Sequence, residues 1–276
     1  MNLLHAFLLG IIQGLTEFIP VSSTAHLLIG QMLMGLPAGD AMFSFLVLVQ
    51  LGTVVSLLLH YWKALSSIAL ATVRHLGDLR DFPSLPAEAR MGWYILIATL
   101  PALLAGYLLK DLVEVLFRLP LLEAAIRLFA AAILLGCAEW LTRKERGLAA
   151  LTWLDALVIG LFQVLAVFPG ASRSGATISG GMFRNLDRPS AARFAFLMSV
   201  PVMLAAGAYE LLDVVRMPGL GRFLPVLAVG FLTAAVVGWL AIGWLLRYLE
   251  KGSLYVFAAY CALAGGVTLA LYLLGG

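Results

Sequence analysis

Charged residues are scarce in this sequence, at 12% of the chain, against about 25% in an average soluble domain. Hydrophobic residues make up 62% of the 276 residues. One core in a protein of this size cannot hide so much apolar surface from water. The shortage of charge therefore excludes an ordinary soluble domain and predicts an integral membrane protein.

Cysteine is rare as well, and Cys137 and Cys261 each stand alone in an apolar stretch. Two isolated cysteines predict neither a disulfide framework nor a metal site, and small buried side chains are the simpler interpretation. The net charge of +3 gives no sign of a nucleic-acid partner. Residues 1–12 are apolar but lack a basic leading segment and a cleavage site, so we expect them in the mature chain.

Six apolar stretches are long enough, at ~17–25 residues, to cross a bilayer as helices. They cover residues 43–61, 92–109, 121–141, 190–212, 223–246 and 254–274. Two further apolar regions, 3–36 and 153–183, are interrupted by turns at Pro20 and Pro169, and each half is too short to cross alone. Irregular backbone survives at membrane depth only where protein or water satisfies it, so both regions are predicted to be re-entrant helical hairpins.

The two interrupted regions resemble each other. The run GIIQ at 10–13 recurs as GLFQ at 160–163, and FSFL at 43–46 recurs as FAFL at 194–197. A nearly constant offset, here about 150 residues, is typical of an internal duplication. The predicted fold is therefore an all-α integral membrane protein, a single membrane domain over 1–276. Its two repeats, 1–150 and 151–276, each have one re-entrant hairpin followed by three transmembrane helices, and three crossings invert the second repeat.

Basic loop residues are concentrated on one side of this topology, which predicts that this side is cytoplasmic. The richer side carries Lys63, Arg74, Arg80, Arg90, Arg143, Lys144, Arg146, Arg184, Arg188, Arg247 and Lys251, and the poorer side carries Lys110, Arg118, Arg216 and Arg222. Both termini are then expected outside. The first hairpin enters from outside and the second from the cytoplasm, so their tips can meet near the midplane, where inverted-repeat proteins place their sites.

The tip of the first hairpin carries ionisable residues, which are costly in a bilayer and so indicate function. Gln13 and Glu17 are four residues apart and share one helix face, where their oxygens suit Mg²⁺ or Ca²⁺. Ser23 and His26 are three apart, the spacing of a nucleophile and its base. The simpler alternatives are that Glu17 pairs with an arginine, that the serines, above all Ser22, cap the helix, and that His26 is a satisfied buried histidine.

The second hairpin turns through the run PGASRSGAT at 169–177. Gly170 and Gly175 let backbone N–H groups approach an anion at a helix N-terminus. Arg173 adds a planar guanidinium suited to phosphate, unless it serves only to pair with Glu17. Gln50 and Gln163 are interpreted mainly as hydrogen-bond formers between helices, with a smaller chance of lining the site.

The runs QGLTEFIPVSSTAH at 13–26 and PGASRSGAT at 169–177 resemble the bacterial undecaprenyl-diphosphate phosphatase (bacitracin-resistance) family. The resemblance covers essentially the whole chain. It implies an inner-membrane enzyme that converts undecaprenyl diphosphate to undecaprenyl phosphate, the lipid carrier for cell-wall glycans, and confers bacitracin resistance. It also implies a divalent cation and a site open to the periplasm. Two positions depart from the family: Gln13 stands where glutamate is frequent, and Ala25 where glycine is usual.

The resemblance implies Glu17, Ser23, His26 and Arg173 as catalytic residues, with Glu17 and Gln13 at the cation. Phosphate contacts are expected from Ser22, Thr24, Gly170, Ser172, Ser174, Gly175 and Thr177. Ser23 would attack phosphorus or position the attacking water, with His26 as proton partner. The predicted partners are a polyprenyl diphosphate and membrane lipids, and a homodimer is left open. The rival hypothesis is a transporter or flippase of polyprenyl phosphate, because paired hairpins and a midplane site are also transporter architecture.

Overall fold

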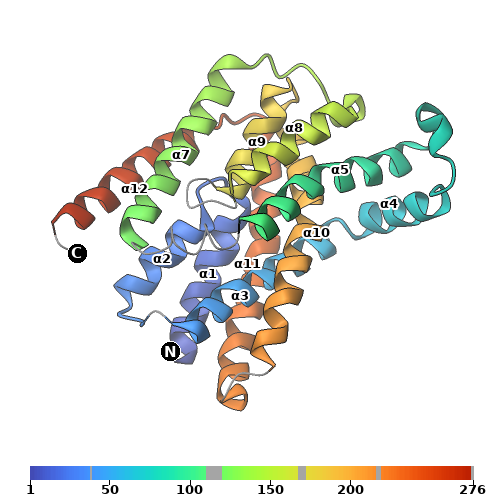
Figure 1. Cartoon of the computed structure of the whole chain (residues 1–276). Helices are drawn as coiled ribbons and strands as arrows, with labels where there is room; N and C mark the ends of the chain where they lie inside the picture. The colour runs from blue at the N-terminus through green and yellow to red at the C-terminus, as the bar shows by residue number, and fades with distance from the viewer. Residues whose placement is uncertain (38, 110–119, 167–171, 216–218, 275–276) are drawn as a thin grey trace.

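The computed structural model describes residues 1–37, 39–109, 120–166, 172–215 and 219–274. Within these residues the fold is all-α, with two 3-10 helices and an isolated bridge between Arg146 and Leu186. The elements are α1 (Leu3–Phe18), α2 (Ser23–Leu33), α3 (Asp40–His60), α4 (Trp62–Arg74), η1 (Leu79–Ser84), α5 (Ala87–Leu108), α7 (Pro120–Leu141), η2 (Leu148–Ala150), α8 (Trp153–Val164), α9 (Arg173–Phe183), α10 (Arg188–Val214), α11 (Leu220–Leu249) and α12 (Tyr255–Leu273). Figure 1 shows their arrangement.

Six of the described helices, α3, α5, α7, α10, α11 and α12, are long and apolar enough to cross a membrane. Each coincides with one of the stretches predicted from the sequence, with small shifts at the ends. A helix satisfies its backbone hydrogen bonds internally, which is why long apolar runs fold this way in lipid. The helices pack in pairs, α7 against α12 and α3 against α11, and Figure 1 shows α7 and α12 side by side.

The two interrupted regions form helical hairpins, α1–α2 and α8–α9. Their arms are shorter than the six long helices, as expected. The outer ends of the second hairpin meet, because Arg184 Nε at the end of α9 donates to Asp155 Oδ1 at the start of α8 over 2.7 Å. The two arms therefore enter and leave the molecule at the same end.

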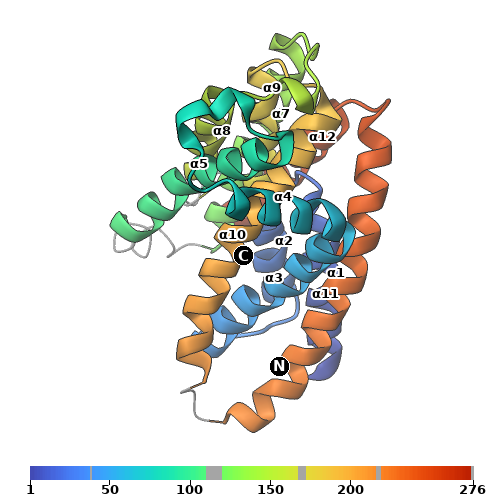
Figure 2. The same ribbon diagram turned by 90° about the vertical axis from the view of Figure 1, so that its right-hand side faces the viewer.

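The first arm of each hairpin packs closely on a long helix, α1 on α11 and α8 on α5. Figure 2 shows α11 along one edge of the molecule with α1 beside it. A Cβ at Gly10 would lie 2.6 Å from the carbonyl oxygen of Gly230, and one at Gly160 would lie 2.5 Å from that of Ala98. Both distances are shorter than van der Waals contact permits. The two glycines are therefore required for the close approach of these helix pairs.

Helix α4 is not among the elements predicted from the sequence. None of its residues is buried, and it lies along α5. Its apolar residues are interrupted by Lys63, Ser66 and Ser67, so it has no long apolar run. A search for continuous apolar stretches of bilayer length does not detect such a helix, because polar residues on one face interrupt the apolar residues of the other.

Loops from the basic-rich side meet in a cluster of ion pairs. Asp155 accepts hydrogen bonds from Arg146 and Arg184, and Arg146 N donates to Asn185 O over 2.9 Å. Glu139 pairs with Arg188 and Lys144. The loops at 142–152 and 184–188, predicted on the same side, therefore lie together.

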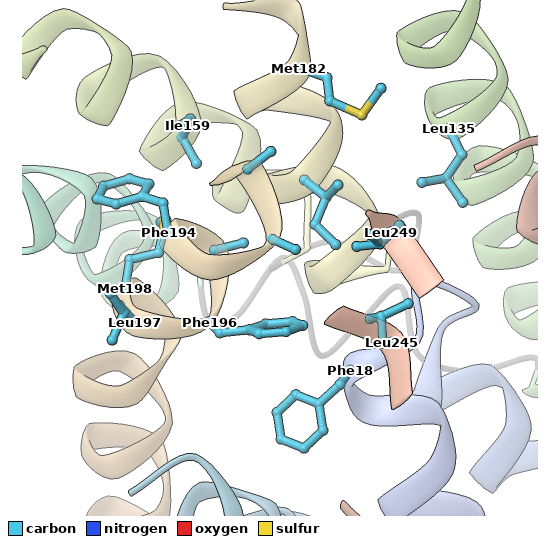
Figure 3. Close-up of a cluster of buried hydrophobic side chains, with 14 of the residues drawn as sticks. Phe18, Leu135, Ile159, Met182, Phe194, Phe196, Leu197, Met198, Leu245 and Leu249 are labelled. Carbon is cyan, nitrogen blue, oxygen red and sulfur yellow. The ribbon is translucent and has the colours of Figure 1, made fainter. Parts of the chain in front are cut away.

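The core holds the end of α1 in place. The ring of Phe18 packs edge-to-face on Phe196 of α10, with centroids 5.4 Å apart. Figure 3 shows both rings beside Leu245 of α11 and Leu249. Phe18 is 2% exposed, so this contact fixes the last turn of α1. The neighbouring residue, Glu17, is held in position by the same packing.

Candidate active site

The tips of the two hairpins meet through an ion pair. Arg173, the first residue of α9, donates from its guanidinium to Oε1 of Glu17 in the last turn of α1. The Glu17 side chain is 3% exposed and that of Arg173 is 22% exposed. A second contact joins the tips, because Ser174 Oγ donates to the carbonyl oxygen of Ile19 over 3.5 Å. The acidic tip and the cationic tip thus complement each other.

The other oxygen of Glu17 accepts two hydrogen bonds. Gln13 Nε2 and Ser23 Oγ each donate to Oε2 over 2.7 Å. The prediction that Gln13 and Glu17 share one helix face is confirmed. Gln13 Oε1 is buried and has no partner among the described residues. The carboxylate is therefore the centre of the first hairpin's tip, and one amide oxygen beside it is left to bind something else.

The predicted pairing of Ser23 with His26 is not the one in the structure. His26 Nδ1 lies 2.9 Å from the Ser22 carbonyl oxygen, and Nε2 lies 2.7 Å from Tyr260 Oη on α12. Because a carbonyl only accepts, Nδ1 carries the hydrogen and neutral His26 accepts from Tyr260 at Nε2. Ser23 and His26 both lie in the first turns of α2, as their spacing predicts, but the Ser23 hydroxyl group donates its hydrogen bond to Glu17.

Ser22 stands at the N-cap of α2, as predicted, but its side chain makes no capping bond. Its φ of 69° lies in the left-handed region, which is costly for any residue except glycine. This conformation turns the chain sharply after Pro20, so that Ser23 comes back to Glu17. The backbone of Ser22 matters more here than its hydroxyl group.

The second tip is built around the start of α9. Ser172 is a true N-cap, with its Oγ accepting from Gly175 N over 3.2 Å and lying 3.2 Å from Ser174 Oγ. Thr177 Oγ1 donates to the Arg173 carbonyl oxygen over 2.8 Å. These contacts place two hydroxyl groups and one guanidinium at a helix N-terminus, where anions are favoured. Gly170, the remaining predicted phosphate contact, lies outside the described residues.

A cavity of about 190 Å³ lies between the hairpin tips. Seven of its lining residues were candidates from the sequence: Glu17, Ser22, Ser23, Thr24, Ser172, Arg173 and Ser174. Gln13, His26, Gly175 and Thr177 are not among its lining residues, although Gln13 contacts Glu17 directly.

The cavity is also lined by polar residues that are not among the site residues predicted from the sequence. They are Gln50 of α3, Arg127 of α7 and Gln163 of α8. One signal could have identified Gln163, because the repeat pairs it with Gln13. Arg127 also had a signal, since an ionisable residue inside the predicted span 121–141 is costly in a bilayer, whereas Gln50 had none.

The donor set fits a divalent cation held partly by the substrate. The described residues contain no cluster of three or more His, Cys, Asp or Glu side chains that could bind a metal. Glu17 offers a carboxylate and Gln13 an unbonded buried oxygen. Mg²⁺ is usually bound through one or two carboxylates together with water and substrate phosphates. These two side chains therefore suit a cation that arrives with a phosphate.

Similarity to known proteins extends over almost the whole chain. A family model described as bacitracin resistance protein BacA matches residues 6–267. A protein of Chlorobium phaeovibrioides named undecaprenyl-diphosphatase is 41% identical over 281 residues, which is 98% of this chain and 97% of the relative. Proteins of the same name from Anaeromyxobacter sp. strain K and Syntrophobacter fumaroxidans are 42% and 38% identical, covering 100% and 98% of this chain and 93% and 97% of their own lengths. Both hairpins fall inside these matches.

Proposed function

This chain belongs to the bacitracin resistance protein BacA family and is an undecaprenyl-diphosphatase, and we propose that its active site is the cavity between the hairpin tips. There it hydrolyses undecaprenyl diphosphate. The products are undecaprenyl phosphate and inorganic phosphate. The observation that carries the proposal is the ion pair between buried Glu17 and partly exposed Arg173, with Ser23 bonded to the same carboxylate. This arrangement combines a phosphate-binding cation, a hydroxyl group and a carboxylate in one cavity.

In the proposed complex Arg173, Ser172 and Ser174 hold the terminal phosphoryl group and the charge that develops on it. All three line the cavity at the N-terminus of α9. Gly175 and Thr177 support them from within the helix, by the N–H bond to Ser172 and the hydroxyl bond to Arg173. Ser22 and Thr24 line the cavity from the other hairpin and complete the polar wall.

Ser23 attacks phosphorus or orients the attacking water. In both cases the bond from the terminal phosphorus to the bridging oxygen breaks and undecaprenyl phosphate leaves. In the first case water later hydrolyses the phosphoserine; in the second case the water oxygen joins phosphorus directly and inorganic phosphate is released. The bond from Ser23 Oγ to Glu17 Oε2 supports Glu17 as the group that receives the proton. His26, with Nε2 on Tyr260, then acts as a more distant proton partner rather than as the direct base.

We assign the divalent cation, Mg²⁺ or Ca²⁺, to Glu17 and Gln13, together with phosphate oxygens and water. When bound, it neutralises negative charge on the diphosphate. The buried oxygen of Gln13, unbonded among the described residues, supports this assignment. Glu17 Oε1 is paired with Arg173, so the cation would compete with Arg173 for this carboxylate, while the phosphate would compete with Glu17 for Arg173.

We further propose that the fold consists of two inverted repeats. In support, α2 and α9 are both 11 residues long and occupy corresponding places in the two repeats. Gly10 and Gly160, matched by the repeat, each give their helix a close approach to a long helix. The same relation pairs α1 on α11 with α8 on α5.

The orientation in the bacterial inner membrane is also proposed. The clustered basic loops around Asp155 and Glu139 face the cytoplasm under the positive-inside rule. Both termini then face the periplasm, and we propose that the cavity opens to the same side, as the family resemblance implies. A reporter enzyme that is active on only one side of the membrane, fused to the C-terminus, tests this assignment. A signal from the cytoplasmic side contradicts it.

The experiment that tests the function is phosphate release from undecaprenyl or farnesyl diphosphate by purified protein in detergent. It is run with Mg²⁺, Ca²⁺ or chelator, for wild type, Glu17→Ala and Arg173→Ala. We expect cation-dependent release that both substitutions abolish. Folded wild-type protein that releases no phosphate under any condition would refute the hydrolase and favour the transporter, which needs no chemistry in detergent.

A further inference from the structure

Gln163 carries a buried carboxamide that has no hydrogen-bond partner among the described residues. The residue is 2% exposed, and neither Oε1 nor Nε2 is bonded within that part of the chain. A buried amide without partners is unfavourable, because it has lost its hydrogen bonds to water. Gln163 lines the same cavity as Glu17 and Arg173. This donor and acceptor, unbonded among the described residues, therefore belong to a side chain that borders the cavity.

The surroundings of Gln163 favour an anion. Arg127 brings a positive charge to the cavity and Gln50 a second amide. Arg127 and Gln50 come from α7 and α3, and Gln163 comes from the last turn of α8, the first arm of the second hairpin, whereas the groups described at the hairpin tips come from α1, α2 and α9. The cavity thus has two sets of polar groups on different helices. Glu17 is the only carboxylate among the lining residues, while Glu123, four residues before Arg127 on α7, interacts electrostatically with Arg127.

The proposed substrate has two phosphoryl groups and so needs two sets of donors. Ser23 and Glu17 stand beside Arg173, so the phosphoryl group that is attacked belongs at the hairpin tips. The phosphoryl group that stays on the lipid then needs donors elsewhere in the same small cavity. Gln163 Nε2 is a buried donor with no other use among the described residues.

We propose that Gln163 is a specificity residue that hydrogen-bonds the phosphoryl group remaining on the lipid, with Arg127 supplying the charge. The inference rests on the proposed diphosphate hydrolysis and deepens it. It makes the cavity selective for a diphosphate over a monophosphate, since only a diphosphate reaches both donor sets. Once the terminal phosphate has left, the lipid monophosphate retains only the second set, which favours its release.

The test compares Gln163→Met with Gln31→Met. Gln31 is also buried, but its Nε2 donates to the Leu36 carbonyl oxygen and it does not line the cavity. With farnesyl diphosphate and Mg²⁺ in detergent, we expect Gln163→Met to raise KM about tenfold or more with a smaller change in kcat, as for loss of a hydrogen bond to a charged group. Gln31→Met should leave both parameters near wild type.

Binding without turnover provides the second readout. Inorganic pyrophosphate and orthophosphate are added to each protein and the rise in Tm is measured. Wild type should be stabilised more by pyrophosphate than by orthophosphate. Gln163→Met should lose that difference and keep the response to orthophosphate. Its own Tm should equal or exceed that of wild type, because an unbonded buried amide has been removed.

Distinct results overturn the inference and the proposed function. Wild-type KM together with wild-type pyrophosphate stabilisation in Gln163→Met overturns the role of Gln163 while leaving the hydrolase intact. A marked fall in Tm shows instead that Gln163 bonds within the protein, and also overturns it. Gln163→Glu is the second variant: its added negative charge should raise KM further than methionine does. Absence of phosphate release by wild type refutes the function, whereas the pyrophosphate measurement still reports on Gln163.

Discussion

Ser23 Oγ donates its hydrogen to Glu17 Oε2 over 2.7 Å, and this carboxylate, rather than His26, is the base within reach of the hydroxyl group. We expect the two residues to act as a unit. In a double-mutant cycle on kcat/KM, Ser23→Ala and Glu17→Gln should couple by about 1 kcal/mol or more. Either single change should cost ~10²–10⁴-fold in rate.

The matched cycle pairs Ser23→Ala with His26→Ala. Both nitrogens of His26 are engaged by Ser22 and Tyr260, so these two effects should add within ~0.5 kcal/mol. Strong coupling of Ser23 with His26, and none with Glu17, would restore the pairing expected from the sequence.

Gln13→Glu should strengthen cation binding. It adds a second carboxylate next to Glu17, and affinity for hard cations rises with ligand charge. We expect the Mg²⁺ concentration for half-maximal phosphate release to fall by about tenfold. In chelator the two carboxylates repel each other, so Tm should fall and recover when Mg²⁺ is added. Gln31→Glu, outside the cavity, is the control, and an unchanged Mg²⁺ requirement for Gln13→Glu would exclude Gln13 as a ligand.

The ionised carboxylate of Asp155 stabilises the fold, and this stabilisation is lost in acid. Burial raises its pKa, but hydrogen bonds from Arg146, Arg184 and Thr152 outweigh this and bring the pKa to about 2. A lowered pKa means that the ionised form stabilises the fold. This stabilisation is complete above the ordinary pKa of 3.8 and is lost as pH falls toward 2.

Asp155→Asn should therefore destabilise the protein by roughly 2 kcal/mol at pH 7, as for loss of hydrogen bonds to a charged group. Thermal unfolding in detergent is measured for wild type and variant from pH 7 down to pH 3. The difference in Tm should shrink at the acidic end. A difference that stays constant with pH would contradict the ionised Asp155.

Gly160→Ala should weaken the packing of α8 on α5. Its methyl group would meet the Ala98 backbone at 2.5 Å, which forces the helices apart at a cost of about 1–3 kcal/mol. Gly136→Ala is the matched control, because a Cβ at Gly136 has no atom within 4 Å. A lower Tm for Gly160→Ala alone is expected. Equal Tm values for the two variants would show that the helix pair tolerates a side chain.

The long helices were predictable because a helix must be long enough to cross the bilayer, and because the residues that face lipid must be apolar. The hairpins were predictable from the interruptions, and the pair Gln13 and Glu17 from helical spacing. The hydrogen bond from Ser23 to Glu17 was not predictable, because it depends on the left-handed backbone conformation of Ser22, which residue spacing does not reveal. Gln163 received little weight because a glutamine in an apolar helix is equally compatible with a bond between helices. Only its position in the cavity separates the two interpretations.

The ion pair between Glu17 and Arg173 also determines what the protein is like between turnovers. Each side chain is the counter-ion of the other, so neither charge is left uncompensated in the cavity. When its lipid substrate is scarce, the enzyme can therefore remain in a resting state in which Glu17 and Arg173 neutralise each other.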